Sequence, residues 1–195
     1  MHAIGRRFEP VHLHIAPALM LLWGFFCSPA PAIDPYPQTG PALDAYQQFV
    51  DHLSTRDFST LYPLLDELSK AYLGCCLDVL SEIKATIDAN PSRFKPEETA
   101  TLKLMFGAKD AQELFSLVME RFFPPLPAGE LDRLRCVEIT PLSPTIYSLR
   151  TVNGREFLLV NQKGEWKLDL SGRFLAFYGE LSDTGEQIGD PLNSQ

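Results

Sequence analysis

Chemically reactive side chains are few and scattered in this 195-residue chain. Of its four histidines, only His52 lies beyond the first 14 residues. We interpret His52 as a partly exposed helix residue, because a metal site or a catalytic relay would need partners that we cannot place. The carboxylates form no recognisable acid–base pair, and the chain has no glycine-rich phosphate loop, nucleophile elbow or zinc-helix motif. The sequence therefore predicts no catalytic residue, no metal site and no cofactor.

Three cysteines lie beyond residue 32: Cys75, Cys76 and Cys136. Cys75 and Cys76 follow Tyr72 by three and four positions, so both border the apolar face of a predicted helix and spacing does not choose between them. A disulfide from either one to Cys136, in a predicted strand, is one expectation in an oxidising compartment. The alternative is that these cysteines are buried as small apolar residues.

Aromatic side chains form the remaining candidate site. Phe157 and Trp166 lie in predicted strands, and Tyr46 and Phe49 lie on the apolar face of the first predicted helix. If the helices cover only part of the sheet, the aromatic residues Phe157, Trp166, Phe174 and Phe177 would line an apolar cavity for a ligand. The alternative is that these aromatic residues only fill the core. We predict a weak ligand-binding site at Trp166, Tyr46, Phe49 and Phe157, with Trp166 as the position to test.

Apolar residues recur at steps of three and four over the first half of the predicted domain, which indicates helices between about residues 41 and 123. The first helix covers about 41–53. A long second helix carries the stripe from Leu61 through Leu68 to Ile87 and ends near Pro91. Two shorter helices follow before the proline-rich stretch at 124–127.

Strand-like segments rich in β-branched and aromatic residues occupy about 132–180. Asn153-Gly154 predicts a type I′ hairpin turn, and Gly164 marks a second turn. The strand at 156–160 is apolar on both faces, which predicts that both faces are covered. Residues 174–181 favour a short helix over a last strand, and 183–195 are predicted to be a loose tail. The chain is thus predicted to be one α+β domain over 41–182, with N-terminal helices packed on a curved antiparallel sheet of about four strands.

The first 32 residues have the order of a secretory signal peptide: Arg6 and Arg7, an apolar run from Ile15 to Phe26, and small residues ending at Ala32. We predict cleavage after Ala32, an extended leader over 33–40, and export to the periplasm or the extracellular space. The apolar run is too short for a stable transmembrane span, although a retained short anchor is the alternative. Two of 17 basic and one of 25 acidic residues leave with the signal, so the remaining chain carries a net charge of −9, which disfavours nucleic acid as a partner.

Two segments together resemble a known superfamily. "AYQQFVDHLSTRDFSTLYPLL" (45–65) is similar to the opening helix pair of nuclear transport factor two-like domains, with Phe49, Val50 and Asp57 at the matching places. "REFLLVNQKGEWKLDL" (155–170) is similar to their closing hairpin. The resemblance implies a conical α+β fold with a pocket between the curved sheet and the helices, but no particular reaction. In the ketosteroid isomerase branch the residue that matches Phe49 is a tyrosine that stabilises an oxyanion, and phenylalanine lacks that hydroxyl.

From these patterns we predict a noncatalytic exported domain that binds a small apolar ligand, a peptide or a partner protein in the bacterial envelope. One alternative is an isomerase or lyase that uses a pocket carboxylate or His52. A second alternative is a structural or assembly protein that acts as a homodimer through the outer face of its sheet.

Overall fold

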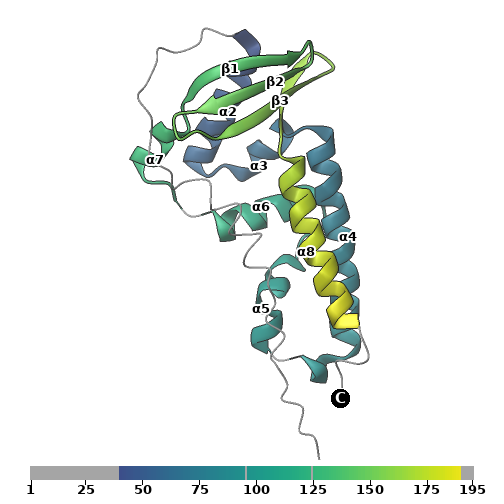
Figure 1. Cartoon of the computed structure of the whole chain (residues 1–195). Helices are drawn as coiled ribbons and strands as arrows, with labels where there is room; N and C mark the ends of the chain where they lie inside the picture. Colours follow the sequence, from purple (N-terminus) through teal and green to yellow (C-terminus); the bar gives the residue numbers. More distant parts are fainter. Residues whose placement is uncertain (1–39, 95, 124, 190–195) are drawn as a thin grey trace, which may run out of the picture.

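The computed structural model describes residues 40–94, 96–123 and 125–189. It is an α+β fold in which six helices of this part of the chain precede a four-stranded antiparallel sheet and one helix follows it, which confirms the predicted fold class (Figure 1). The helices are α2 (Gly40–Thr55), α3 (Phe58–Leu61), α4 (Glu67–Ala89), α5 (Pro96–Met105), α6 (Ala111–Phe122), α7 (Ala128–Arg133) and α8 (Ser171–Gly189). The strands are β1 (Cys136–Ser143), β2 (Ile146–Thr151), β3 (Glu156–Gln162) and β4 (Glu165–Asp169). The predicted signal peptide, and the predicted leader apart from Gly40, lie outside the described residues.

The sheet is a meander with the strand order β1-β2-β3-β4. On its inner face Leu149 of β2 lies opposite Phe157, and Leu159 of β3 lies opposite Leu168, and all three leucines are buried. On the outer face Leu158 remains 38% exposed. Helices cover the inner face of β3, as predicted, whereas helices in the described part of the chain do not cover its outer face; the predicted cover there by another element or a second subunit stays a prediction. Apolar residues on the outer face are tolerated because much of any folded surface is apolar.

The predicted turn at Gly164 is present, but the turn at Asn153-Gly154 differs from the predicted type. Asn153 does not adopt a positive φ, so Asn153-Gly154 is not a type I′ turn; only Gly154, at φ 77°, is left-handed. The hydroxyl of Thr151 and the backbone of Arg155 close a three-residue loop there, and the Asn153 amide donates to the carbonyl of Arg133, which fixes that loop against the end of α7. The paired positive φ values of a type I′ turn occur instead at Lys163 and Gly164, between β3 and β4.

The second predicted helix is interrupted before α4. Leu65 forms a parallel bridge with Leu168 of β4, and the carboxylate of Asp66 accepts a hydrogen bond from the Ser69 amide at 2.9 Å to cap α4. The chain at 65–66 is thus extended, because it pairs with the edge of the sheet. This break rotates the apolar face of α4, so that Leu68, a member of the predicted stripe, is 51% exposed.

Helices α4 and α8 run side by side away from the sheet (Figure 1). The Leu170 amide donates to the Ser69 hydroxyl, so the starts of both helices lie next to each other at the sheet. Because both helices run away from the sheet, they are parallel. Their buried residues repeat at alternating steps of three and four, the seam of a short coiled coil. This seam consists of Leu73, Cys76, Leu80, Ile83 and Ile87 on α4 and of Phe174, Phe177, Leu181, Thr184 and Ile188 on α8.

The C-terminal helix is longer than predicted. Residues 174–181 are helical as favoured, but α8 continues to Gly189, so the tail predicted to be loose from residue 183 is helical over 183–189. The reason is tertiary, because Thr184 and Ile188 are buried, and Ile188 packs in the same apolar cluster as Ile83 and Ile87 of α4. The sheet correspondingly ends at Asp169, before the predicted limit near 180.

The buried side chains form two separate clusters. The first core joins the inner face of the sheet to α2, α3 and the beginning of α8. The second core lies between α4, α5, α6 and α8, away from the sheet. No helix in the described part of the chain is both long and apolar enough to cross a membrane.

Arg56 joins α2 to α6. Its backbone has a φ of 58°, and its amide and that of Asp57 donate back to Leu53 and His52, which is a Schellman motif that usually carries glycine. The side chain explains why an arginine occupies this position. Its guanidinium donates to the carbonyl of Phe123 at 2.5 Å and to that of Glu120 at 3.1 Å, which satisfies the free carbonyl groups at the C-terminal end of α6.

Candidate functional site

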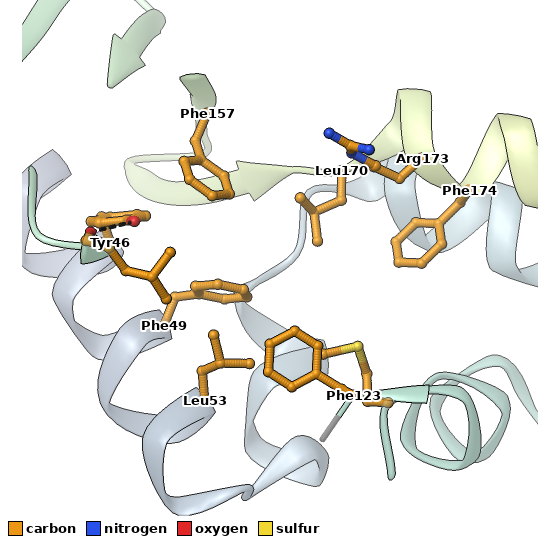
Figure 2. A pocket seen from close by; sticks show the side chains of 10 residues that line it. Tyr46, Phe49, Leu53, Phe123, Phe157, Leu170, Arg173 and Phe174 are labelled. Atoms are coloured by element: carbon orange, nitrogen blue, oxygen red, sulfur yellow. Dashed lines mark hydrogen bonds between the residues drawn. The ribbon is translucent and has the colours of Figure 1, made fainter. Parts of the chain in front are cut away.

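A small apolar cavity lies in the first core, between α2, the end of α6, β3 and the first turn of α8 (Figure 2). We call it the aromatic cleft. It has a volume of about 50 Å³ and opens to solvent on one side. It is lined by Tyr46, Phe49, Leu53, Met119, Phe123, Leu134, Phe157, Leu170, Arg173 and Phe174.

One wall of the aromatic cleft comes from α2 and β3. Tyr46, Phe49 and Leu53 follow one another at steps of three and four, so the helix presents them on one face. Phe157 projects from the inner face of β3, with its ring centroid 5.4 Å from that of Tyr46. The Tyr46 hydroxyl donates a hydrogen bond to the carbonyl of Leu134 at 2.8 Å, so this buried polar group has a partner.

The opposite wall comes from segments that are distant in the sequence. Met119 and Phe123 lie at the end of α6, and Leu170 and Phe174 lie at the start of α8. The backbone of this wall is held in place, because the Phe123 carbonyl accepts from Arg56 and the Leu170 amide donates to Ser69 at 2.8 Å. The cleft is therefore bounded by side chains on a fixed backbone.

Arg173 is the one charged residue of this lining. Figure 2 shows its guanidinium beyond Leu170, on the same side of the cleft as Phe157. The side chain is partly buried, and this desolvation lowers the pKa of Arg173 from its ordinary value, although a guanidinium stays protonated at neutral pH. The cleft thus combines an apolar interior with a single cation at its edge.

The predicted site residues divide into two groups. Tyr46, Phe49 and Phe157 come together in the aromatic cleft. Trp166 does not line it, because the β3–β4 register places Trp166 opposite Asn161, near the end of the hairpin, where its ring packs 4.5 Å from that of Tyr147. Trp166 is thus partly buried at one edge of the inner face and outside the lining of the aromatic cleft, so its predicted ligand contact stays a prediction.

Sequence reasoning missed Arg173 altogether. An arginine beside an aromatic residue, as in Arg173-Phe174, is too common to indicate a site. Its role in the cleft depends on the start of α8, where the Arg173 amide donates to the carbonyl of Leu170 at 2.9 Å. Only a prediction of that helix start, and of its position next to β3, could have found it.

His52 lies outside the aromatic cleft. Its Nδ1 is 3.8 Å from the carboxylate of Asp57, and both side chains are partly exposed. Hydrogen bonds from Thr60 and Ser59 lower the pKa of Asp57, which caps α3 by accepting from the Thr60 amide. This geometry makes Asp57 a capping residue, and it gives His52 no reacting partner in the cleft.

Among the described residues Cys75, Cys76 and Cys136 are free thiols. Of the two alternatives, this geometry agrees with free cysteines, because Cys76 is buried in the second core and Cys136 in the first. Burial raises the pKa of the Cys76 thiol to about 12 and also raises that of Cys136. Cys75, its neighbour in the sequence, lies outside the seam of α4 and is exposed.

In the described ranges no group of three or more histidine, cysteine or acidic residues is placed to hold a metal ion.

A larger and more open groove of about 570 Å³ lies over α6. Two of its carboxylates, those of Asp110 and Glu113, have structural partners. Asp110 accepts from the Glu113 amide at 2.8 Å, and Glu113 accepts in return from the Lys109 amide at 2.9 Å. These bonds cap the N-terminal end of α6, so we assign the groove no chemistry.

Comparison with models of known protein families finds no match to this chain, and comparisons with curated proteins and with solved structures find none either. The resemblance to nuclear transport factor two-like domains therefore stays a prediction.

Proposed function

We propose that this protein is an exported noncatalytic domain that binds a small apolar ligand in the aromatic cleft. The observation that carries the proposal is the cleft itself, a cavity between sheet and helices whose interior is apolar. Apolar cavities of this kind are stable while empty and bind apolar molecules of matching size. Three residues proposed for this role from the sequence, Tyr46, Phe49 and Phe157, lie in its wall. The export signal is part of the proposal and rests on the N-terminal sequence alone.

The isomerase or lyase alternative gains no support from this geometry. Among the described residues, neither His52 nor any aspartate or glutamate lines the cleft. A general base must lie within hydrogen-bond reach of the proton that it removes, and the described lining offers no carboxylate or imidazole.

A titration with 1-octanol tests the proposal. If the cleft is a binding site, the methyl NMR signals of Leu53 and Leu170 shift on addition of 1-octanol, while those of Leu80 in the second core do not. The variant Leu170→Phe adds a ring beside the cavity, and we expect it to weaken binding at least about 10-fold, or about 1.4 kcal/mol.

The matched control is Leu175→Phe, because Leu175 lies on α8 with 48% of its surface exposed and outside the cleft lining. It should bind 1-octanol as the unmodified chain does. Equal weakening in both variants, or shifts spread over both cores, would show that 1-octanol does not bind in the aromatic cleft.

One observation favours a second candidate function, assembly through the outer face of the sheet. Leu158 exposes 38% of its surface on the outer face of β3, and Leu142, at the register shift near the end of β1, exposes 60%. Exposed apolar groups on one face of a sheet are suited to contact a second subunit.

A further inference from the structure

Two aromatic rings in the wall of the aromatic cleft are supported from behind by a second ring. Phe123 packs edge-on against Phe58, with ring centroids 6.4 Å apart, and Phe174 packs edge-on against Phe115 at 6.2 Å. The supporting rings of Phe58 and Phe115 are buried and lie outside the described lining. Protein interiors are packed as densely as organic crystals, so a wall ring cannot retreat without displacing the ring behind it.

The wall formed by α2 and β3 is fixed in a similar way. The ring of Tyr46 lies 5.4 Å from that of Phe157 and 6.5 Å from that of Phe49, and its hydroxyl donates to the carbonyl of Leu134. Met119 differs from these rings, because its side chain is unbranched and adapts to the space available. The cleft therefore has stiff aromatic walls with one flexible side chain among them, so its width restricts what can enter.

We propose that the aromatic cleft binds the unbranched end of an alkyl chain, which enters with its terminal methyl group first. This inference rests on the proposed function and specifies its ligand class. The interior of the cleft is apolar, so a hydroxyl or charged group placed there would lose its hydrogen bonds to water. The polar end of the ligand thus stays at the open side of the cleft, in contact with solvent.

The volume of the cleft excludes a ring. A dry apolar cavity of about 150 Å³ accepts benzene, whereas pockets for drug-sized molecules measure roughly 300–1,000 Å³. The aromatic cleft, at about 50 Å³, holds in proportion about two carbon atoms. These are the last carbons of a linear chain, and the open side leaves room for the remainder of that chain.

Four uncharged alcohols with the same number of carbons test the inference on the full chain. They are 1-octanol, 2,2-dimethyl-1-hexanol, 5,5-dimethyl-1-hexanol and cyclooctanol, with dissociation constants measured from the methyl signals of Leu53 and Leu170. Branches beside the hydroxyl stay outside the cavity, so we expect the first two alcohols to bind within about threefold of each other. Each buried methylene group contributes about fourfold in affinity, so the tail-branched and cyclic alcohols should bind at least about 10-fold more weakly.

Enlarging the cavity should remove this selectivity. Met119→Ala takes away the flexible part of the wall without disturbing the supported rings, and we expect it to raise the affinity for cyclooctanol at least about 10-fold. The matched control is Met105→Ala, because Met105 is also buried but lies in the second core. It should leave the order of the four alcohols unchanged at Leu53 and Leu170.

The outcomes separate the two proposals. Equal binding of 1-octanol, 5,5-dimethyl-1-hexanol and cyclooctanol to the unmodified chain overturns the selection of a linear chain end while leaving the apolar site in place. Equal weakening by both branched alcohols overturns entry by the terminal methyl group. Absence of binding by all four alcohols overturns this inference and the proposed function together. These comparisons use the unmodified chain, so they hold whether or not Met119→Ala folds.

Discussion

At the scale of single residues, burial decides which thiols can react. Cys75 and Cys76 are adjacent in the sequence, yet the seam of α4 buries Cys76 completely and leaves Cys75 exposed. The Cys76 thiol donates to the carbonyl of Phe174 at 3.8 Å, and that of Cys136 donates to the carbonyl of Glu138 at 3.4 Å. Burial raises the pKa of both thiols, so both are protonated at neutral pH and shielded from solvent. Since the reactive form of a cysteine is the thiolate, neither is expected to react readily.

Thiol labelling follows from this difference. In the native protein at pH 7.5 we expect iodoacetamide to modify Cys75 about 100-fold faster than Cys76 or Cys136, because the two buried sites react only when the structure opens. Peptide mapping of the labelled chain measures each site separately. In denaturant all three should react at similar rates. Rapid native labelling of Cys76 would contradict the parallel packing of α4 on α8.

At the scale of secondary-structure elements, α4 and α8 stabilise each other through their matched seams. Their spacing is tight at one place, where a β-carbon added to Gly185 would lie 3.4 Å from Cγ1 of Ile83. At Gly74, in the interior of α4, an added β-carbon meets nothing within 4 Å. Two glycines at helical positions therefore differ only in what surrounds them.

Replacing these glycines measures the packing directly. Gly74→Ala should raise the free energy of unfolding by about 0.5–1 kcal/mol, because alanine is the better helix former and the site has room. Gly185→Ala has the same helical advantage, but its methyl group crowds Ile83, so we expect a net change within about 0.5 kcal/mol of zero.

The double variant Gly185→Ala with Ile83→Ala serves as the check on that interpretation, because Ile83→Ala removes both Cγ1 and Cδ1, the two atoms that the new methyl group meets. The pair should show a favourable coupling of at least about 0.5 kcal/mol in a double-mutant cycle, measured by urea unfolding. Strict additivity of the two changes would mean that α4 and α8 do not approach as closely as described.

At the scale of the whole molecule, the two faces of the sheet have different roles. The inner face closes the first core and bounds the aromatic cleft, whereas the outer face leaves Leu158 exposed. Two ion pairs lie on this outer face, Arg150 with Glu138 and Lys167 with Glu165. The register adds two further carboxylates there, because Glu156 lies opposite Arg150 and Asp169 lies opposite Leu158. The pairs offset part of the repulsion between two copies of this face.

If the outer face is an interface between two copies, light scattering should report a dimer at micromolar concentration. Leu158→Glu should then weaken the dimer at least about 10-fold by placing a charge in the contact. Leu175→Glu, at a leucine on α8 that is more exposed than Leu158, should leave the dimer intact. A strict monomer at high concentration would exclude assembly through this face and leave the aromatic cleft as the remaining candidate function.

Local pattern was enough to predict much of the fold. The steps of three and four in α2 and α6, the alternation along β2–β4, and the turn at Gly164 all depend on neighbours in the sequence. Tyr46, Phe49 and Phe157 could be chosen in the same way, since each lies on the apolar face of its own element.

Other features depend on contacts between residues far apart in the chain. The break at Leu65 requires the edge of β4, and the length of α8 requires the face of α4. The choice of Cys76 over Cys75 follows from how that same pair of helices is rotated. For the same reason Arg173 lines the cleft and Trp166 does not. The strand register places Trp166 near the end of the β3–β4 hairpin, and the start of α8 places Arg173 beside the cleft. The sequence by itself thus determined which elements form and which faces are apolar, because these are local properties. Only the tertiary structure decided which faces meet and where a cavity is left between them.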